Sequence, residues 1–175
     1  MPDRQLLLLR HAKAVPGDAG LADIDRPLAE RGENAAAAIG RYLAEHGLKP
    51  DLVLCSPARR TRQTWEIAAR ELPQTKTKFI DELYDFGDGS TLLDAIRRHG
   101  KDAQRLMLVT HNPATQALAL ALAGKAEKSL RRKMAEKYPT AGLALLSFPA
   151  GNWADTAEGQ GRLDGFVTPR ELLQA

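Results

Sequence analysis

The chain has 175 residues, with 25 lysines and arginines against 22 acidic residues, and its formal net charge is +3. A chain of this length buries roughly 70% of its unfolded surface, so one domain over residues 1–175 is expected, with a core that needs no disulfide or metal. Hydrophobic residues make up 43% and charged residues 27%, which excludes a disordered or collagen-like chain. The single cysteine, Cys55, excludes an intramolecular disulfide and a cysteine-rich metal site.

Neither a membrane nor a nucleic acid is an expected partner. The apolar runs Leu6–Leu9 and Ala117–Ala123 are much shorter than the ~20 residues of a membrane-spanning helix. The charged N-terminal residues do not resemble a signal peptide, so a cytoplasmic location is expected. The small net charge and the 5% content of aromatic residues do not favour binding to nucleic acid. The oligomeric state is left open by these patterns.

Short apolar runs alternate with longer amphipathic stretches, which is typical of βαβ units around a parallel sheet. The first elements are a strand at Gln5–Leu9, a helix at 27–46, a strand at Asp51–Cys55 and a helix from Ser56 to about Leu72. Gly47 is placed to end the first helix. Ser56 is the predicted N-cap of the second helix, and Pro57 its first residue.

The second half continues the alternation. Its predicted elements are a strand at Lys76–Ile80, a helix at Ser90–His99 capped by Ser90, a strand at Arg105–Thr110, a helix from Asn112-Pro113 to Gly124, a strand at Gly142–Phe148 and an edge strand at Arg162–Val167. Lys125–Lys137 holds six basic and two acidic residues, which favours a solvated helix face over an acidic partner's binding surface. The pattern predicts an α/β fold with helices on both faces of a mostly parallel sheet.

Three strands of this sheet are followed by reactive side chains. The first ends in Arg10 and His11, the second leads to Arg59 and Arg60, and the Arg105–Thr110 strand is followed by His111. Because the carboxyl ends of parallel strands meet at one edge, these groups are expected to converge. Paired arginines and a helix N-terminus bind a dianionic oxyanion, so the predicted ligand is a phosphoryl group.

The two histidines fit different tasks in phosphoryl transfer. A neutral imidazole at His11 would attack phosphorus, and His111 would donate a hydrogen bond to the phosphoryl oxygens. Two other histidines belong to different patterns: Arg98-His99-Gly100 and His46-Gly47 each end a predicted helix. A cysteine phosphatase is excluded because Thr61 stands where its arginine would follow Cys55.

The residues at these strand ends resemble the histidine phosphatase superfamily, which has the phosphoglycerate mutase-like fold, and its SixA-type phosphohistidine phosphatase branch. The matching segments are LLLLRHAKA, DIDRPLAERG, SPARRTRQT, LYDF, VTHNP and YPTAGLALLSF, in order along nearly the whole chain. The family's Arg-His-Gly signature has Ala12 in place of glycine here, a departure that SixA-like members often share.

The resemblance implies a three-layer α/β/α sandwich and a histidine phosphatase domain over residues 1–175. It further implies that His11 becomes a phosphohistidine and that Arg10, Arg60 and His111 form the phosphate pocket. Arg60 is preferred to Arg59 because the family pattern places the arginine four residues after Ser56.

Other roles stay open. Arg26 is either a substrate-phosphate contact or the partner of Asp23 or Asp25 in an ion pair. Glu82 and Asp85 are candidate general acids or, equally, acidic loop residues facing water. An imidazole leaving group protonates near pH ~6.5, so phosphohistidine needs a dedicated acid less than an alcohol ester does.

The expected function is removal of a phosphoryl group, from protein phosphohistidine, through a phosphohistidine on His11. The alternatives are a broad phosphatase for small phosphomonoesters and a phosphate-binding module without catalysis. The expected partner is correspondingly a phosphorylated protein or a small phosphomonoester. The four histidines show no ligand spacing with acids, so neither a metal nor another cofactor is expected.

Overall fold

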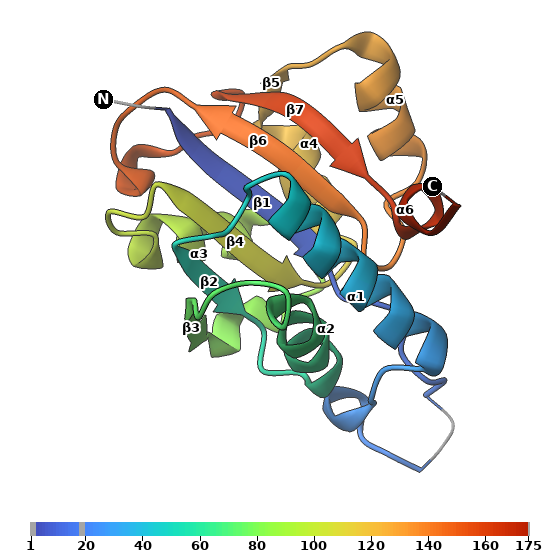
Figure 1. The fold of residues 1–175 in the computed structure, drawn as a ribbon. Coiled ribbons are helices and arrows are strands. Elements are labelled where there is room, and N and C mark those ends of the chain that lie inside the picture. The colour runs from blue at the N-terminus through green and yellow to red at the C-terminus, as the bar shows by residue number, and fades with distance from the viewer. Residues whose placement is uncertain (1–2, 18–19, 175) are drawn as a thin grey trace.

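The computed structural model describes residues 3–17 and 20–174. Within them the chain forms one seven-stranded sheet with helices on both faces (Figure 1). The strands are β1 (Arg4–Arg10), β2 (Leu52–Cys55), β3 (Lys76–Phe79), β4 (Arg105–Thr110), β5 (Ala123–Lys125), β6 (Leu143–Phe148) and β7 (Gly161–Val167). The helices are α1 (Glu30–Glu45), α2 (Arg59–Ala69), α3 (Ser90–His99), α4 (Ala114–Leu122), α5 (Lys128–Glu136) and α6 (Pro169–Gln174). Three 3-10 turns, η1 (Asp23–Asp25), η2 (Asp81–Leu83) and η3 (Trp153–Asp155), lie in the connections.

The strands lie in the order β3-β2-β4-β1-β6-β7-β5. Neighbours β1 and β4, β4 and β2, β2 and β3, and β5 and β7 are parallel, whereas β6 runs antiparallel to both β1 and β7. The predicted mostly parallel sheet is therefore confirmed. β1 and β4 lie side by side at its centre, so their carboxyl ends reach the same point of the sheet edge.

Strand β1 has helices packed on both of its faces, which gives the fold three layers. Successive side chains of a strand point to opposite faces, and both faces of this strand are buried. Leu6 and Leu8 pack in the core with α3, α4 and α5, while Leu7 and Leu9 pack in the core with α1 and α2. A run of leucines thus joins two hydrophobic cores, and the predicted α/β/α sandwich is confirmed.

Two predicted helix caps are wrong. Helix α2 begins at Arg59, without a side-chain cap, and the hydroxyl of Ser56 contacts His111 instead. Helix α3 has the predicted bounds, but its N-cap is Gly89, with φ at 92°, and Ser90 is its first residue. Glycine adopts a left-handed conformation at little energetic cost, because it has no Cβ atom. The N-cap position before α3 therefore favours glycine over serine.

Several boundaries also differ. The predicted helix at 27–46 begins three residues later, at Glu30, because the preceding segment pairs with the loop after β1 through a bridge between Ala14 and Leu28. The helix that was expected to reach Gly124 ends at Leu122, and the next residues form β5. Because β5 pairs with β7, β7 is not the edge strand that the sequence predicted. Among the described residues no helix has the length and apolarity needed to cross a membrane.

Gly32 in helix α1 fits the backbone after β1 closely. A Cβ atom at this position would lie 2.1 Å from the carbonyl oxygen of Lys13, which accepts a hydrogen bond from the N–H of Ala29. We expect Gly32→Ala to lower the free energy of unfolding by about 1–3 kcal/mol, because the backbone must shift to admit the methyl group. Chemical denaturation measures this. Asn34→Ala, an exposed change on the same helix, is the control, and equal stability of both variants would contradict the close fit.

Candidate active site

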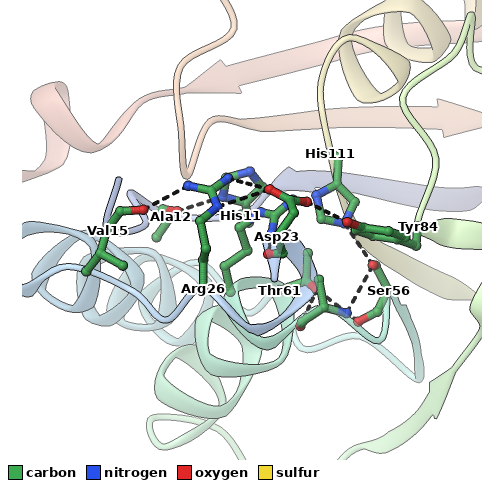
Figure 2. Close-up of polar contacts among 11 residues, drawn as sticks. His11, Ala12, Val15, Asp23, Arg26, Ser56, Thr61, Tyr84 and His111 are labelled. Carbon is green, nitrogen blue, oxygen red and sulfur yellow. Dashed lines mark hydrogen bonds and ion pairs between the residues drawn. The ribbon is translucent and has the colours of Figure 1, made fainter. Parts of the chain in front are cut away.

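Main-chain hydrogen bonds hold three strand ends together. The N–H of His11 donates to the carbonyl of Thr110 at 3.0 Å, and the N–H of Ser56 donates to the carbonyl of Val109 at 3.1 Å. His111 follows directly after Thr110, and its ring centroid lies 5.3 Å from that of His11 (Figure 2). The predicted meeting of the two histidines at the sheet edge is therefore what the structure shows.

The ring of His11 is oriented by its neighbour in the chain. Its Nδ1 lies 2.7 Å from the carbonyl oxygen of Ala12. A carbonyl only accepts hydrogen bonds, so Nδ1 carries the proton, and Nε2 holds the lone pair in the neutral ring. The pKa of His11 is lowered to about 4, mainly by burial; the positive charges of Arg60 and Arg10 contribute to this lowering, and the hydrogen bond to Ala12 opposes it. His11 is therefore a neutral imidazole at pH 7, with Nε2 available as a nucleophile.

His111 is fully buried and is oriented by Ser56. Its Nε2 lies 2.8 Å from Ser56 Oγ, and that oxygen also accepts the N–H of Ala58 at 3.4 Å. The Ser56 hydroxyl hydrogen is then free to donate to Nε2, which leaves the proton of His111 on Nδ1. Burial lowers the pKa of His111 to about 3, with smaller contributions from His11 and Arg60.

The low pKa values of His11 and His111 predict how the protonation of these rings and the stability of the protein depend on pH. Both rings stay neutral until the pH falls through about 4 and about 3, well below the ordinary value of 6.5. We expect NMR titration of their ring C–H signals to show no protonation between pH 8 and 5. Below pH 6.5, His11 and His111 become protonated in the unfolded chain but stay neutral in the folded protein. The free energy of unfolding therefore decreases as the pH falls. Titration of either ring near pH 6.5 would contradict the buried, neutral site.

Two arginines border the histidines. Arg60 is 2% exposed, and it donates from Nη1 to the carbonyl of Asp23 at 2.8 Å and from Nη2 to Asp23 Oδ2 at 3.0 Å. Arg10 donates from Nη1 to the carbonyl of Tyr138 at 2.8 Å. In both cases one end of the guanidinium is held by the protein, while the Nε atom has no hydrogen-bond partner.

These two Nε atoms and one ring nitrogen of His111 are buried without a hydrogen-bond partner. Among the described residues, the buried side-chain nitrogens and oxygens without a partner are Arg10 Nε, Arg60 Nε and His111 Nδ1. Leaving a buried donor unpaired is costly, so native proteins keep few such groups. All three belong to residues that the sequence assigned to the phosphate pocket. They supply donors for an oxyanion.

Asp23 organises the site in a way that the sequence did not reveal. Its carboxylate accepts from Arg60, from Arg26 at 3.0 Å and from the hydroxyl of Tyr84 at 2.5 Å (Figure 2). The hydrogen bond from Tyr84 is the main cause that lowers the pKa of Asp23 to about 2, and the two arginines add to it. An ionised Asp23 therefore holds Arg60 in place and leaves its Nε free.

Arg26 shows the ion pair that the sequence left as one of two alternatives. Its Nε and Nη2 atoms lie 3.0 Å from Asp23 Oδ1, and Nη1 donates to the carbonyl of Val15 at 2.8 Å. All three guanidinium nitrogens are thereby engaged. A contact of Arg26 with substrate stays a prediction, although its charge is close enough to lower the pKa of His11.

The acidic residues proposed as proton donors are not brought to the histidines. Glu82 is exposed, and the carboxylate of Asp85 accepts the N–H of Gly87. The neighbouring aromatic rings face the site instead, since Tyr84 and Phe86 lie 5.4 Å and 4.9 Å from the His111 ring. A role of Glu82 or Asp85 as general acid stays a prediction, and no contact among the described residues supports it.

The residues that the sequence set aside make none of the contacts described above. Arg59 is exposed at the start of α2, and His46 ends α1 with its Nδ1 near the carbonyl of Tyr42. His99 is the last residue of α3. Cys55 is buried in β2, and burial raises the pKa of its thiol to about 12, so it is no thiolate nucleophile.

Comparison with known proteins places the chain in a family. Residues 6–91 match the family model of the histidine phosphatase superfamily (branch 1). A crystal structure assigned as the phosphohistidine phosphatase SixA of Agrobacterium tumefaciens is 34% identical, covers 97% of this chain and 100% of its own, and superposes with a TM-score of 0.80. The chain belongs to the histidine phosphatase superfamily. The family resemblance seen in the sequence is thus confirmed.

Two further relatives match over nearly the whole chain. A second structure assigned as a SixA phosphohistidine phosphatase, from Nakamurella multipartitia, is 30% identical, covers 97% of this chain and 98% of its own, and has a TM-score of 0.83. The uncharacterized protein Rv1276c of Mycobacterium tuberculosis is 39% identical over 164 residues, which are 93% of this chain and 100% of the relative. The sequence resembles SixA, and the superfamily consists mainly of hydrolases.

Proposed function

We propose that this protein is a phosphatase that removes the phosphoryl group from phosphohistidine in proteins, with His11 as nucleophile. One observation carries the proposal: the unpartnered donors Arg10 Nε, Arg60 Nε and His111 Nδ1 belong to the groups around a neutral His11. Three donors around a nucleophile match the three equatorial oxygens of a phosphoryl group during transfer. A SixA structure that shares this fold, with a TM-score of 0.75, was solved with tungstate, which is a tetrahedral oxyanion like phosphate.

The reaction proceeds in two displacements. In the first, Nε2 of His11 attacks phosphorus, a new P–N bond forms, and the P–N bond to the substrate imidazole breaks. The substrate imidazole takes up one proton from solvent and so departs as a neutral ring, and the donors of Arg10, Arg60 and His111 stabilise the charge on the phosphoryl oxygens. In the second, the oxygen of a water molecule attacks phosphorus and the P–N bond to His11 breaks. Both protons of the water leave with the phosphate, as H2PO4−, and the neutral imidazole is restored.

The position of the acidic side chains favours phosphohistidine over phosphomonoesters. An alkoxide leaving group needs a strong proton donor, whereas a protonated imidazole departs readily. Neither Glu82 nor Asp85 contacts the histidines, and the hydroxyl of Tyr84 already donates to Asp23. Phosphohistidine therefore matches the groups present at the site.

The test compares phosphate release from a phosphohistidine peptide and from an aryl phosphate, with the His11→Ala protein as blank. We expect kcat/KM for the phosphohistidine peptide to be at least about tenfold higher, which corresponds to about 1.4 kcal/mol of transition-state stabilisation. The reverse preference would assign the protein to small phosphomonoesters. Binding of phosphate without release from either substrate would identify a binding module.

A further inference from the structure

A groove of about 620 Å³ lies where α1, α5 and α6 meet, and Lys13 of the loop after β1 is one of its lining residues. Helix α6 contacts α1 (Figure 1), and its Glu171 pairs with Lys133 of α5. Ala35, Phe166 and Leu173 contribute apolar surface to the groove. Leu173 is 50% exposed, so part of this apolar surface faces solvent.

The charged residues around the groove are predominantly basic. Five basic side chains line it, and Glu136 is its one acidic lining residue. Lys133 is neutralised by Glu171, whereas the others form no ion pair within the described part of the chain. These unpaired cations are Lys13, Arg31, Lys137 and Arg170. The groove therefore presents an apolar surface bordered by positive charge.

The groove adjoins the nucleophile through the backbone. Lys13 is two residues beyond His11, so their Cα atoms are at most about 7 Å apart. Thr140, which also lines the groove, precedes Ala141, whose N–H donates to the carbonyls of Arg10 and His11 at 3.0 Å and 2.9 Å. A molecule whose phosphoryl group reaches His11 would thus have its neighbouring atoms near this groove.

We infer that this groove docks an acidic, amphipathic segment of the phosphorylated protein, an inference that rests on the proposed function. Binding sites for small molecules contain a few polar groups fixed in buried positions. Here the buried lining residues are Ala35 and Phe166, and the basic side chains are all exposed. Exposed charges around an apolar surface instead suit a polypeptide that places apolar side chains inward and carboxylates outward. The docked segment also holds the phosphorylated residue near His11.

Direct binding tests the groove independently of catalysis. Two labelled, unphosphorylated helical peptides would be compared by fluorescence anisotropy, with the same apolar face and with either Glu or Gln at the polar positions. We expect the Glu peptide to bind at least about tenfold more tightly and to weaken as salt rises. The preference should disappear in the triple variant Arg31→Glu, Lys137→Glu, Arg170→Glu. The matched control is Arg41→Glu, Arg98→Glu, Lys76→Glu, whose residues are exposed and do not line the groove.

Kinetics then separate this inference from the proposed function. In the groove variant, KM should rise about tenfold for a phosphohistidine peptide with the Glu-rich flank, while kcat and the hydrolysis of phosphoramidate stay unchanged. Equal binding of both peptides, or full retention by the groove variant, would refute the docking surface and leave the phosphatase intact. Tighter binding of a single-stranded oligonucleotide at the same salt concentration would also refute an acidic protein as the occupant. If the unaltered protein did not hydrolyse phosphohistidine, the proposed function would be overturned. The peptide-binding measurement would still show whether the groove is a docking surface.

Discussion

Replacing His11 with alanine is expected to lower kcat by at least about a thousandfold, since removal of a catalytic nucleophile in another enzyme costs up to about 10⁶. The alanine side chain cannot form the P–N bond on which both displacements depend. Phosphate release from a phosphohistidine peptide measures the loss. Denaturing the unaltered enzyme during turnover in alkali, which preserves P–N bonds, should trap phosphate on residue 11. The variant should trap none, yet it should still bind tungstate through Arg10, Arg60 and His111.

His46→Ala is the matched control for His11→Ala. It removes an exposed histidine at the C-terminal end of α1 whose Nδ1 lies near the carbonyl of Tyr42, outside the contacts of the candidate site, so turnover and trapped phosphate should remain unchanged. His99→Ala provides a second control, because His99 belongs to the Arg-His-Gly sequence that resembles the family signature literally. Unchanged turnover in the His11 variant, or lost turnover in either control, would refute the assignment of the nucleophile.

Replacing Arg60 with alanine is expected to lower kcat/KM by about 100- to 1,000-fold, the usual effect of removing a donor to a developing oxyanion. The loss should appear equally for phosphohistidine and aryl phosphate substrates, because Arg60 is proposed to contact the phosphoryl group that they share. Inhibition by tungstate should weaken in parallel. Arg60 is buried, so a thermal unfolding measurement must accompany the kinetics.

Two further variants separate the function of Arg60 from its structural role. Arg60→Lys keeps the positive charge but loses the planar fork, so we expect stability nearer to the unaltered protein with kcat/KM still at least about tenfold lower. Arg59→Ala removes the preceding arginine, which is exposed on the same helix, and should leave kinetics unchanged. If Arg59→Ala and Arg60→Ala had equal effects, the phosphate pocket would not be the one proposed here.

The hydrophobic pattern was enough to predict most of the fold. Four consecutive leucines in β1 supply both cores, which follows from the period of two in a strand and needs no knowledge of its neighbours. Helix α3 and strand β4 have the predicted bounds, because glycine and polar residues delimit each of them. The short strand β5 was not predictable, since Ala123–Lys125 has no strand pattern and pairs only because β7 lies beside it.

The strand ends in the sequence also grouped Arg10, His11 and His111 with the pair Arg59 and Arg60 at one edge of the sheet, and the family resemblance selected Arg60 from that pair. The sequence did not show which atoms of these residues are free to act. That was decided by contacts between distant segments: Asp23 holds Arg60 across 37 positions of sequence, and Ser56 holds His111 across 55. The local hydrophobic pattern determines where each strand ends, and therefore at which edge of the sheet the following side chain lies. The orientation of that side chain depends on hydrogen-bond partners from distant loops, which only the folded chain brings within reach.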